Sequence, residues 1–142
     1  MTYLRDNTPE KDVIMSFWDY GYWILDIADR QPVVDNGRHP ENADRDIALV
    51  YVTADDSEAV RIMRKYKADY LVFSTVEYRI LPMITDDAFG EPYGDGDSIP
   101  REMRDSLYSR ALAGDLEFDG GLKRIYPDPG VTKPEVVILG FG

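Results

Sequence analysis

The pattern of apolar and polar positions divides the chain into short alternating segments, which is typical of a protein that mixes helices and strands. Apolar residues recur at helical spacing over 21–30 and 57–67. The second segment also begins with acidic residues and ends with basic ones, as the helix dipole favours. Short runs rich in branched and aromatic residues predict strands at 13–15, 33–34 and 69–74.

Other segments are less decisive. Residues 1–12 are polar and are expected to form a loop, and a tight turn is expected at Asp35-Asn36-Gly37, after the strand at 33–34. A polar loop then extends to about Asp46. The run 47–52 fits a helix or a strand equally well, because six apolar residues do not discriminate between the two.

The middle of the chain is expected to contain a helix over 75–84, interrupted by a proline. Pro82 has no N–H to donate to residue 78, and its ring crowds that carbonyl, so the helix is expected to kink or end there. An acidic, glycine-rich loop follows over 85–99. Pro100 then opens another helix, which runs to about Gly114.

Two apolar runs close the chain, at 122–126 and 135–139, and Pro127-Asp128-Pro129-Gly130 separates them. They are expected to pair as a terminal hairpin. No internal repeat or shift in composition marks a boundary within residues 1–142. The prediction is therefore one compact α+β or mixed α/β domain, with about four helices packed on a small sheet.

Composition narrows the classes of function. The 142 residues carry a formal charge of −11, which disfavours nucleic acid and anionic lipid as partners. Cysteine is absent, so there is neither a disulfide framework nor a thiolate metal site. His39 is the sole histidine and lies in a polar loop, which argues against a histidine zinc site or a Ser-His-Asp triad.

The sequence shows no membrane or export signal. No apolar run approaches the roughly 18 residues that cross a bilayer, and the first residues lack the apolar centre of a signal peptide. As given, the chain is expected to be soluble.

The most unusual stretch is Ser16-Phe17-Trp18-Asp19-Tyr20-Gly21-Tyr22-Trp23-Ile24, where aromatic rings crowd around one carboxylate. The Trp18 indole N–H can only donate a hydrogen bond, and the ionised Asp19 can only accept one. A serine or threonine hydroxyl, which does both, could be held between them. The alternative is an aromatic core cluster in which Asp19 is the N-cap of the next helix, and these residues alone favour that alternative.

Signatures of complete catalytic centres are absent from the sequence. It contains no Gly-x-Gly-x-x-Gly, no phosphate-binding loop and no Gly-x-Ser-x-Gly. Asp95, Asp97 and Glu102 resemble part of a calcium loop, but the remaining ligands and the required glycine are out of register, which favours a solvated loop.

The segment Phe17-Trp18-Asp19-Tyr20-Gly21 resembles the Trp-Trp-Asp-Tyr-Gly motif of the catalytic subunit of oligosaccharyltransferase, the membrane enzyme of asparagine-linked glycosylation. Tyr22-Trp23-Ile24, Ala28-Asp29-Arg30 and Val34-Asp35-Asn36 continue the similarity, followed by the predicted helix 57–67 and by Asp69-Tyr70-Leu71-Val72. This covers the first half of the chain. The chain resembles the C-terminal globular domain of short archaeal AglB-like members.

A second motif of that family has a Met-x-x-Ile-x-x-x-(Ile, Val or Trp) form or an Asp-Lys form. The segment Glu77-Tyr78-Arg79-Ile80-Leu81-Pro82-Met83-Ile84 resembles the first form, with Ile80 and Ile84 matching and Glu77 in the place of methionine. The Asp-Lys register fits less well. The kink expected at Pro82 agrees with the bent helix of the family.

The resemblance implies that Trp18 and Asp19 bind the hydroxyl of the Ser or Thr two residues after the acceptor asparagine. Phe17 replaces the first tryptophan of the motif, so its contribution is apolar, and Ile80 packs on the threonine methyl. Burial of one methyl favours Thr over Ser by about 0.8 kcal/mol, or roughly fourfold. The remaining motif positions, which are Tyr20, Gly21, Glu77 and Ile84, support these groups.

The resemblance also implies what the chain lacks. Residues 1–142 are expected to be the C-terminal soluble part of a multi-spanning enzyme at the extracytoplasmic face of the membrane. That enzyme uses a divalent metal, Mn or Mg, and a lipid-linked, dolichol-type oligosaccharide donor, both held by its membrane part. The isolated chain is expected to bind no metal, to contain no catalytic residue, to bind acceptor peptide weakly and to be inactive.

Two other functions remain compatible with the residues. One is a free-standing module that binds a sugar or a peptide through the aromatic cluster, with stacking on Trp18, Tyr22 or Trp23. The other is an interaction domain without a pocket. Titration with free oligosaccharide and with an Asn-x-Thr peptide distinguishes the three.

Overall fold

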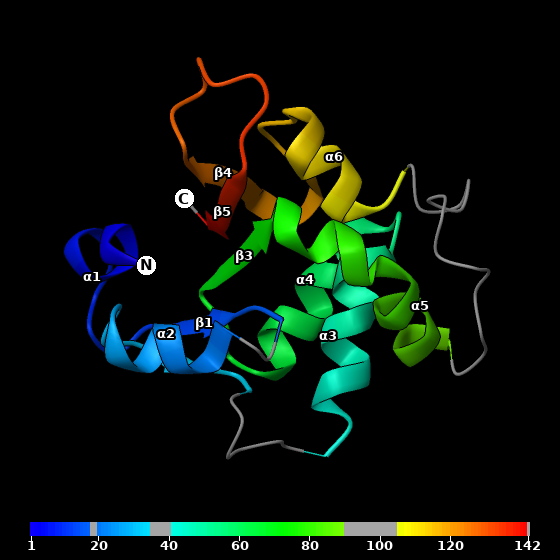
Figure 1. Ribbon diagram of the computed structural model, residues 1–142, viewed down its shortest axis with the longest axis horizontal. Helices are drawn as coiled ribbons and strands as arrows, with labels where there is room; N and C mark the ends of the chain where they lie inside the picture. The colour runs from blue at the N-terminus through cyan, green and yellow to red at the C-terminus, as the bar shows by residue number, and fades with distance from the viewer. Residues whose placement is uncertain (18–19, 35–40, 90–104, 142) are drawn as a thin grey trace.

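A five-stranded mixed sheet forms the centre of the computed structural model, which describes residues 1–17, 20–34, 41–89 and 105–141 (Figure 1). The order across the sheet is β2-β1-β3-β5-β4. The strands are β1 (Val13–Met15), β2 (Gln31–Pro32), β3 (Tyr70–Ser74), β4 (Leu122–Tyr126) and β5 (Val136–Phe141).

The sheet has a parallel half and an antiparallel half. Strand β1 pairs in parallel with β2 on one side and with β3 on the other, whereas β3, β5 and β4 pair antiparallel. The terminal hairpin predicted from sequence is therefore confirmed. The strand predicted at 33–34 is wrong by two residues, because Gln31 and Pro32 are the residues in register with Val13 and Ile14. The turn predicted at 35–37 lies outside the described residues.

Six α-helices occur in the described part of the chain. They are α1 (Thr2–Asn7), α2 (Gly21–Asp26), α3 (Ala43–Val52), α4 (Asp56–Lys65), α5 (Leu81–Phe89) and α6 (Leu107–Ala113). The undecided run 47–52 is helical, and the polar loop before it ends at Asn42 instead of Asp46. Helix α2 ends four residues earlier than predicted, at Asp26. Helix α4 has Asp55 as its N-cap, with the side chain accepting from the Ser57 N–H.

The loop predicted over 1–12 is wrong for its first part, because α1 forms there. Leu4 is fully buried, and the Tyr3 hydroxyl donates to the carbonyl of Ile125 in β4 at 3.2 Å. The rings of Tyr3 and Tyr126 lie 4.6 Å apart. A single buried leucine gives no apolar periodicity, so the local sequence does not predict this helix. Contacts with residues far along the chain stabilise it instead.

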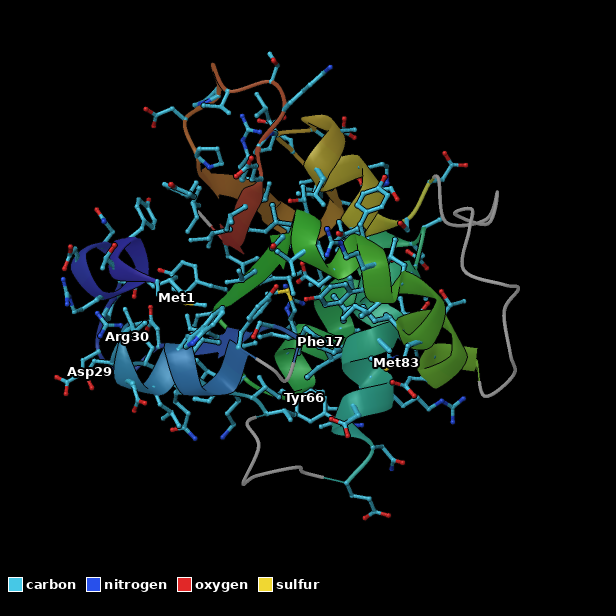
Figure 2. The ribbon with its side chains drawn as sticks, in the orientation of Figure 1. Met1, Phe17, Asp29, Arg30, Tyr66 and Met83 are labelled. Carbon is cyan, nitrogen blue, oxygen red and sulfur yellow. The ribbon has the colours of Figure 1, made fainter. Side chains whose placement is uncertain are left out.

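Arg30 holds α1 against the segment that follows α2 (Figure 2). Its buried guanidinium donates to the Thr8 hydroxyl at 2.9 Å and to the main-chain carbonyls of Arg5 and Thr8 on the side of α1. It also donates to the carbonyls of Ala28 and Asp29, at 3.1 and 2.7 Å. A planar guanidinium with five donors satisfies this ring of acceptors, which lysine cannot reproduce.

Helices cover both faces of the sheet. Successive residues of a strand point to opposite faces. Phe73 therefore packs with Tyr51 of α3 and Tyr108 of α6 on one face, at ring distances of 4.6 and 5.4 Å. Val72 and Ile138 face the other side, where they line a cavity together with residues of α1 and α2. The expected mixed α/β class is confirmed, with short helices adding to the four expected.

The helix predicted over 75–84 is two elements. A 3-10 helix, η2 (Thr75–Ile80), leads directly into α5, of which Pro82 is the second residue. In the first turn of an α-helix the main-chain N–H groups have no partner within the helix, so the missing N–H of proline costs nothing there. The 3-10 helix accordingly gives way to the α-helix one residue before the proline. Helix α5 also includes residues 85–89, which were expected to begin the acidic loop. The rest of that loop, with Pro100, lies outside the described residues, and the following helix, α6, begins at Leu107.

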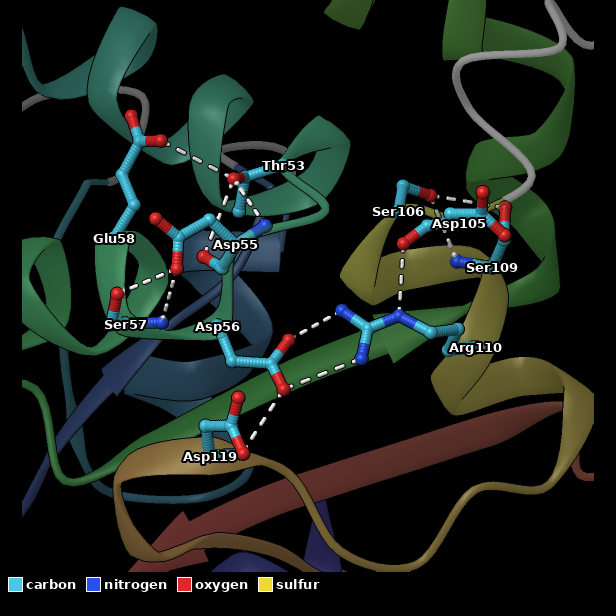
Figure 3. Close-up of polar contacts among 10 residues, drawn as sticks. All are labelled: Thr53, Asp55, Asp56, Ser57, Glu58, Asp105, Ser106, Ser109, Arg110 and Asp119. Atoms are coloured by element: carbon cyan, nitrogen blue, oxygen red, sulfur yellow. Dashed lines mark hydrogen bonds and ion pairs between the residues drawn. The ribbon is translucent and has the colours of Figure 1, made fainter.

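A buried carboxylate joins α4 and α6 to the 3-10 helix η4 (Asp119–Gly121) (Figure 3). Asp56, in the first turn of α4, forms an ion pair with Arg110 of α6 and accepts a hydrogen bond from the main-chain N–H of Asp119 at 3.0 Å. Asp56 is 6% exposed. This contact fixes α6 relative to α4 and so supports the packing around Tyr108.

Candidate functional site

The described residues on either side of Trp18 and Asp19 are held by buried groups. Phe17 is 3% exposed, and its main-chain N–H donates to the Tyr51 hydroxyl at 2.9 Å. Its carbonyl accepts from the Tyr20 N–H at 3.0 Å. Trp18 and Asp19 themselves lie outside the described residues. The motif is therefore anchored to the protein core on both sides.

Tyr20 and Gly21 form the entry to α2. Gly21 is the first residue of the helix and Tyr20 is its N-cap. Asp19, which the alternative interpretation expected as the N-cap, lies outside the described residues. The Tyr20 ring stacks on Trp23 at 5.6 Å and meets the Phe17 ring edge-on at 6.5 Å. Phe17 and Tyr20 thus pack as an aromatic pair, as the core-cluster interpretation predicted for part of the motif.

Glu77, which stands in the place of methionine in the second motif, has a structural role. It is fully buried and forms a capping box with Ser74, the N-cap of η2. The Ser74 N–H donates to the carboxylate at 2.7 Å, and the Val76 N–H donates to the Ser74 hydroxyl at 3.0 Å. Two N–H groups at the start of the helix are thereby satisfied.

Tyr51 connects Glu77 to Phe17. Its hydroxyl oxygen lies 2.9 Å from a carboxylate oxygen of Glu77 and 3.2 Å from the carbonyl of Val72. A hydroxyl has one proton, so the shorter contact, with the carboxylate oxygen of Glu77, is the stronger hydrogen bond. The oxygen lone pairs remain for the Phe17 N–H. The structure therefore brings Phe17 and Glu77, from the two predicted motifs, into one buried network.

Burial dominates the acid-base properties of this network. Removal from water raises the pKa of Glu77 to about 7, although the hydrogen bonds from Tyr51 and Ser74 act in the opposite direction. Burial, together with the neighbouring Glu77 charge, raises the pKa of Tyr51 well above its ordinary value. Tyr51 is therefore a neutral hydroxyl at physiological pH, and Glu77 is the group that titrates.

An aromatic cluster orients the Tyr51 hydroxyl. The Tyr51 ring stacks on Tyr108 at 5.6 Å and meets Phe73 edge-on at 4.6 Å. Tyr108 in turn donates to the carbonyl of Ser74 at 2.6 Å. Residues from α3, β3 and α6 thus fix the hydroxyl at a single place.

The two isoleucines of the second motif differ in exposure. Ile84 is 1% exposed and belongs to the hydrophobic core, whereas Ile80 is partly buried and packs against the core. Of the two, only Ile80 retains surface that could meet a ligand. Val76, on the same 3-10 helix, is 66% exposed.

An apolar cavity of about 300 Å³ lies beside the motif. Trp23 lines it from α2 and Tyr20 from the N-cap of that helix, Leu4 lines it from α1, and Val72 and Ile138 line it from the sheet. Trp23, one of these lining residues, is 54% exposed. The cavity offers burial for apolar groups.

The described residues do not assemble a metal site or a membrane span. Within them, no three histidine or acidic side chains come close enough to hold a metal ion. None of the helices in the described ranges is both long and apolar enough to cross a bilayer.

Comparison with known proteins identifies the family. The model of the AglB core domain, the AglB core-like family, matches residues 1–77 of the 142. The chain belongs to the AglB core-like family. The matched residues contain the Phe17–Gly21 motif, Tyr51 and Ser74, and they end at Glu77.

Curated relatives of this AglB core-like chain include a glycosyltransferase subunit. The dolichyl-diphosphooligosaccharide–protein glycosyltransferase subunit stt3 of Schizosaccharomyces pombe is 36% identical over 70 residues, which make up 49% of this chain and 9% of that subunit. This chain therefore spans less than a tenth of that relative.

Solved structures show the same fold. The C-terminal globular domain of an oligosaccharyltransferase from Archaeoglobus fulgidus superposes with a TM-score of 0.76 at 21% identity, covering 99% of this chain and 92% of that domain.

Longer oligosaccharyltransferase chains from Archaeoglobus fulgidus contain the same fold, each superposing on 88% of this chain. One, in complex with an inhibitory peptide and a dolichol-phosphate, has a TM-score of 0.64, 14% identity and 22% of its length covered. Another, tethered to an acceptor peptide containing an NVT sequon, has a TM-score of 0.63, 14% identity and 22% covered. A third, a complex with Zn and sulfate, has a TM-score of 0.68, 15% identity and 24% covered.

Sequence reasoning missed the residues that connect the site. Tyr51 lies in the run 47–52, which fits a helix or a strand equally well. The sequence alone therefore does not predict to which side the Tyr51 side chain points. A signal for Glu77 was present, since Ser74-x-x-Glu77 has the Ser-x-x-Glu spacing of a capping box. That spacing explains a carboxylate at this position better than a replaced methionine does.

Proposed function

We propose that this chain is the acceptor-recognition part of an asparagine-linked oligosaccharyltransferase. Trp18 and Asp19 bind the hydroxyl of the Ser or Thr in an Asn-x-Ser/Thr sequon, and Ile80 packs on the threonine methyl. The network that joins Phe17 to Glu77 through Tyr51 carries this proposal, because it brings the two family motifs into one framework. Membership of the AglB core-like family supports it.

Catalysis takes place outside this chain. A membrane part of the longer enzyme, facing the extracytoplasmic side, supplies the metal ligands and binds the lipid-linked oligosaccharide. This chain contributes a hydrogen-bond donor in Trp18, an acceptor in Asp19 and the framework behind them. The dolichol-phosphate and peptide in an Archaeoglobus fulgidus relative support such partners. The isolated chain is inactive and binds peptide weakly, because it forms only part of the cleft.

Selectivity follows from the cost of unsatisfied groups. An acceptor without the hydroxyl leaves the Trp18 indole and the Asp19 carboxylate without their partner, at about 1–3 kcal/mol for each group. This is more than the roughly 0.8 kcal/mol that separates Thr from Ser. Rejection of sequences without a hydroxyl is therefore the main task of the site.

The test is glycosylation of an Asn-x-Thr peptide by the longer enzyme carrying Asp19→Ala, with Asp26→Ala as the matched control. Asp26 is exposed at the end of α2, seven positions along the chain. We expect a loss of activity of at least about tenfold for Asp19→Ala and none for Asp26→Ala. Unchanged activity for Asp19→Ala would overturn the assignment.

A titration of this 142-residue chain distinguishes the competing function. Free oligosaccharide and an Asn-x-Thr peptide are added separately, and the indole resonances of Trp18 and Trp23 are followed by NMR. Resonance shifts that occur with the Asn-x-Thr peptide but not with an Asn-x-Ala peptide support sequon recognition. Shifts with oligosaccharide alone, centred on the exposed Trp23, identify a carbohydrate-binding module instead.

A further inference from the structure

The Tyr51 hydroxyl is placed to fix the main chain next to the proposed acceptor-binding residues. It accepts from the N–H of Phe17, the residue that immediately precedes Trp18, at 2.9 Å. It lies at the same distance from the Glu77 carboxylate on η2. One buried oxygen therefore joins the backbone of the first motif to a side chain of the second.

The surroundings of Tyr51 make this oxygen a fixed reference point. Tyr51 is fully buried, and its ring is held between Tyr108 and Phe73. The hydroxyl proton is directed by Glu77, which is itself fixed by the Ser74 N–H at 2.7 Å. A side chain whose ring and proton are both determined by neighbours positions its partner with little freedom.

We infer that Tyr51 is a positioning residue for acceptor recognition, setting the place of the backbone at Phe17 and keeping it in register with the helix that begins the second motif. This inference rests on the proposed function. Tyr51 does not touch the acceptor. It acts through Phe17, and Glu77 acts through Tyr51.

The first measurement is amide hydrogen exchange at Phe17 in this chain. In Tyr51→Phe the ring and its packing remain, but the acceptor oxygen is lost. We expect exchange at Phe17 to become about tenfold faster or more. The matched control is Tyr66→Phe, which also removes a hydroxyl bonded to a carboxylate, that of Asp46 at 2.5 Å. It should leave exchange at Phe17 unchanged.

The second measurement is steady-state glycosylation by the longer enzyme, with an Asn-x-Thr peptide as acceptor. We expect Tyr51→Phe to raise the KM for peptide about three- to tenfold while kcat stays within about twofold. Tyr66→Phe should change neither constant. A merely structural role would lower the amount of active enzyme, and thus kcat, without moving KM.

A second variant tests the link to Glu77. In Glu77→Gln the amide oxygen can accept from Ser74 while the amide NH₂ donates to Tyr51, whose proton then turns to the Val72 carbonyl 3.2 Å away. The oxygen of Tyr51 stays in place, so we expect KM near that of the unmodified enzyme. Glu77→Ala, which provides neither contact, should raise KM as Tyr51→Phe does.

The outcomes separate this inference from the proposed function. If Asp19→Ala abolishes glycosylation but Tyr51→Phe leaves both KM and exchange at Phe17 unchanged, the positioning role is overturned and the proposed function stands. If Asp19→Ala leaves glycosylation unchanged, the proposed function falls, and the positioning role falls with it. An equal loss in kcat for Tyr51→Phe and Tyr66→Phe, with KM constant, also overturns the positioning role.

Discussion

The carboxylate of Glu77 accepts a hydrogen bond from the main-chain N–H of Ser74 at 2.7 Å, and does so from a fully buried position. The capping box stabilises the start of η2, but it also places an ionisable group away from water. Burial raises the pKa of Glu77 to about 7, close to physiological pH. The capping box therefore contains a carboxyl group that titrates near neutral pH.

We predict that Glu77 makes folding less favourable as pH rises. Its folded pKa of about 7 lies above its unfolded value of 4.5, so between these values the native state holds a proton that the unfolded state has released. Relative to Glu77→Gln, the protein should lose about 2 kcal/mol of unfolding free energy between pH 5 and pH 8. Urea denaturation of both chains at four pH values measures this. A constant difference between them would contradict the prediction.

The hydrogen bonds of the Arg30 guanidinium predict that replacement by lysine lowers the stability of the protein substantially. In Arg30→Lys one ammonium replaces five donors, so most of the carbonyls that Arg30 contacts, those of Arg5, Thr8, Ala28 and Asp29, lose their partner. We expect a loss of about 2–3 kcal/mol in urea denaturation. The same substitution at Arg61, on the exposed face of α4, should have no measurable effect. Equal losses at both positions would show that Arg30 does not act through its geometry.

The buried ion pair of Asp56 predicts that replacing Asp56 lowers stability more than replacing the exposed Asp6. Asp56→Ala leaves the Arg110 guanidinium and the Asp119 N–H without their acceptor, and we expect it to lower the unfolding free energy by about 2 kcal/mol. Asp6→Ala breaks an exposed pair with Arg5 and should leave stability unchanged. Denaturant titration of the two variants measures both unfolding free energies. Equal values would contradict the role of Asp56 in joining α4 to α6.

The partly buried Ile80 predicts how substrate preference responds to mutation in the longer enzyme. If its side chain packs on the threonine methyl, Ile80→Ala should reduce the preference for Asn-x-Thr over Asn-x-Ser from about fourfold towards onefold. Val76→Ala, on the same 3-10 helix and 66% exposed, is the control and should keep the ratio. The ratio of kcat/KM for the two peptides is the measurement. A ratio that survives Ile80→Ala would remove Ile80 from the site.

The sequence was informative about the fold where the local pattern and the tertiary environment agree. The hairpin and β3 were predictable because alternating or continuous apolar runs between turns have few other uses. Helix α1 was not predictable, since it rests on one buried leucine and on contacts with Arg30 and β4. Those contacts join residues far apart in sequence, which no local pattern records.

The candidate site was predictable to a lesser extent. The motif around Phe17 and the second motif around Ile80 could be found from sequence, but their connection could not. Tyr51 lies in a run that fits helix or strand, and only its helical conformation brings its hydroxyl to Phe17 and Glu77. The roles of Trp18 and Asp19 stay predictions.

The sheet order connects the C-terminal hairpin with the first motif. The residues matched by the AglB core-like family contain β2, β1 and β3, the parallel half of the sheet, whereas β5 and β4 are encoded downstream of the match. Strand β3 pairs with β5 from Tyr70 to Ser74, so the two halves of the sheet share one continuous set of main-chain hydrogen bonds. A change that shifts β5 therefore acts on β3 and, through β3, on β1, which leads into the Phe17–Gly21 motif.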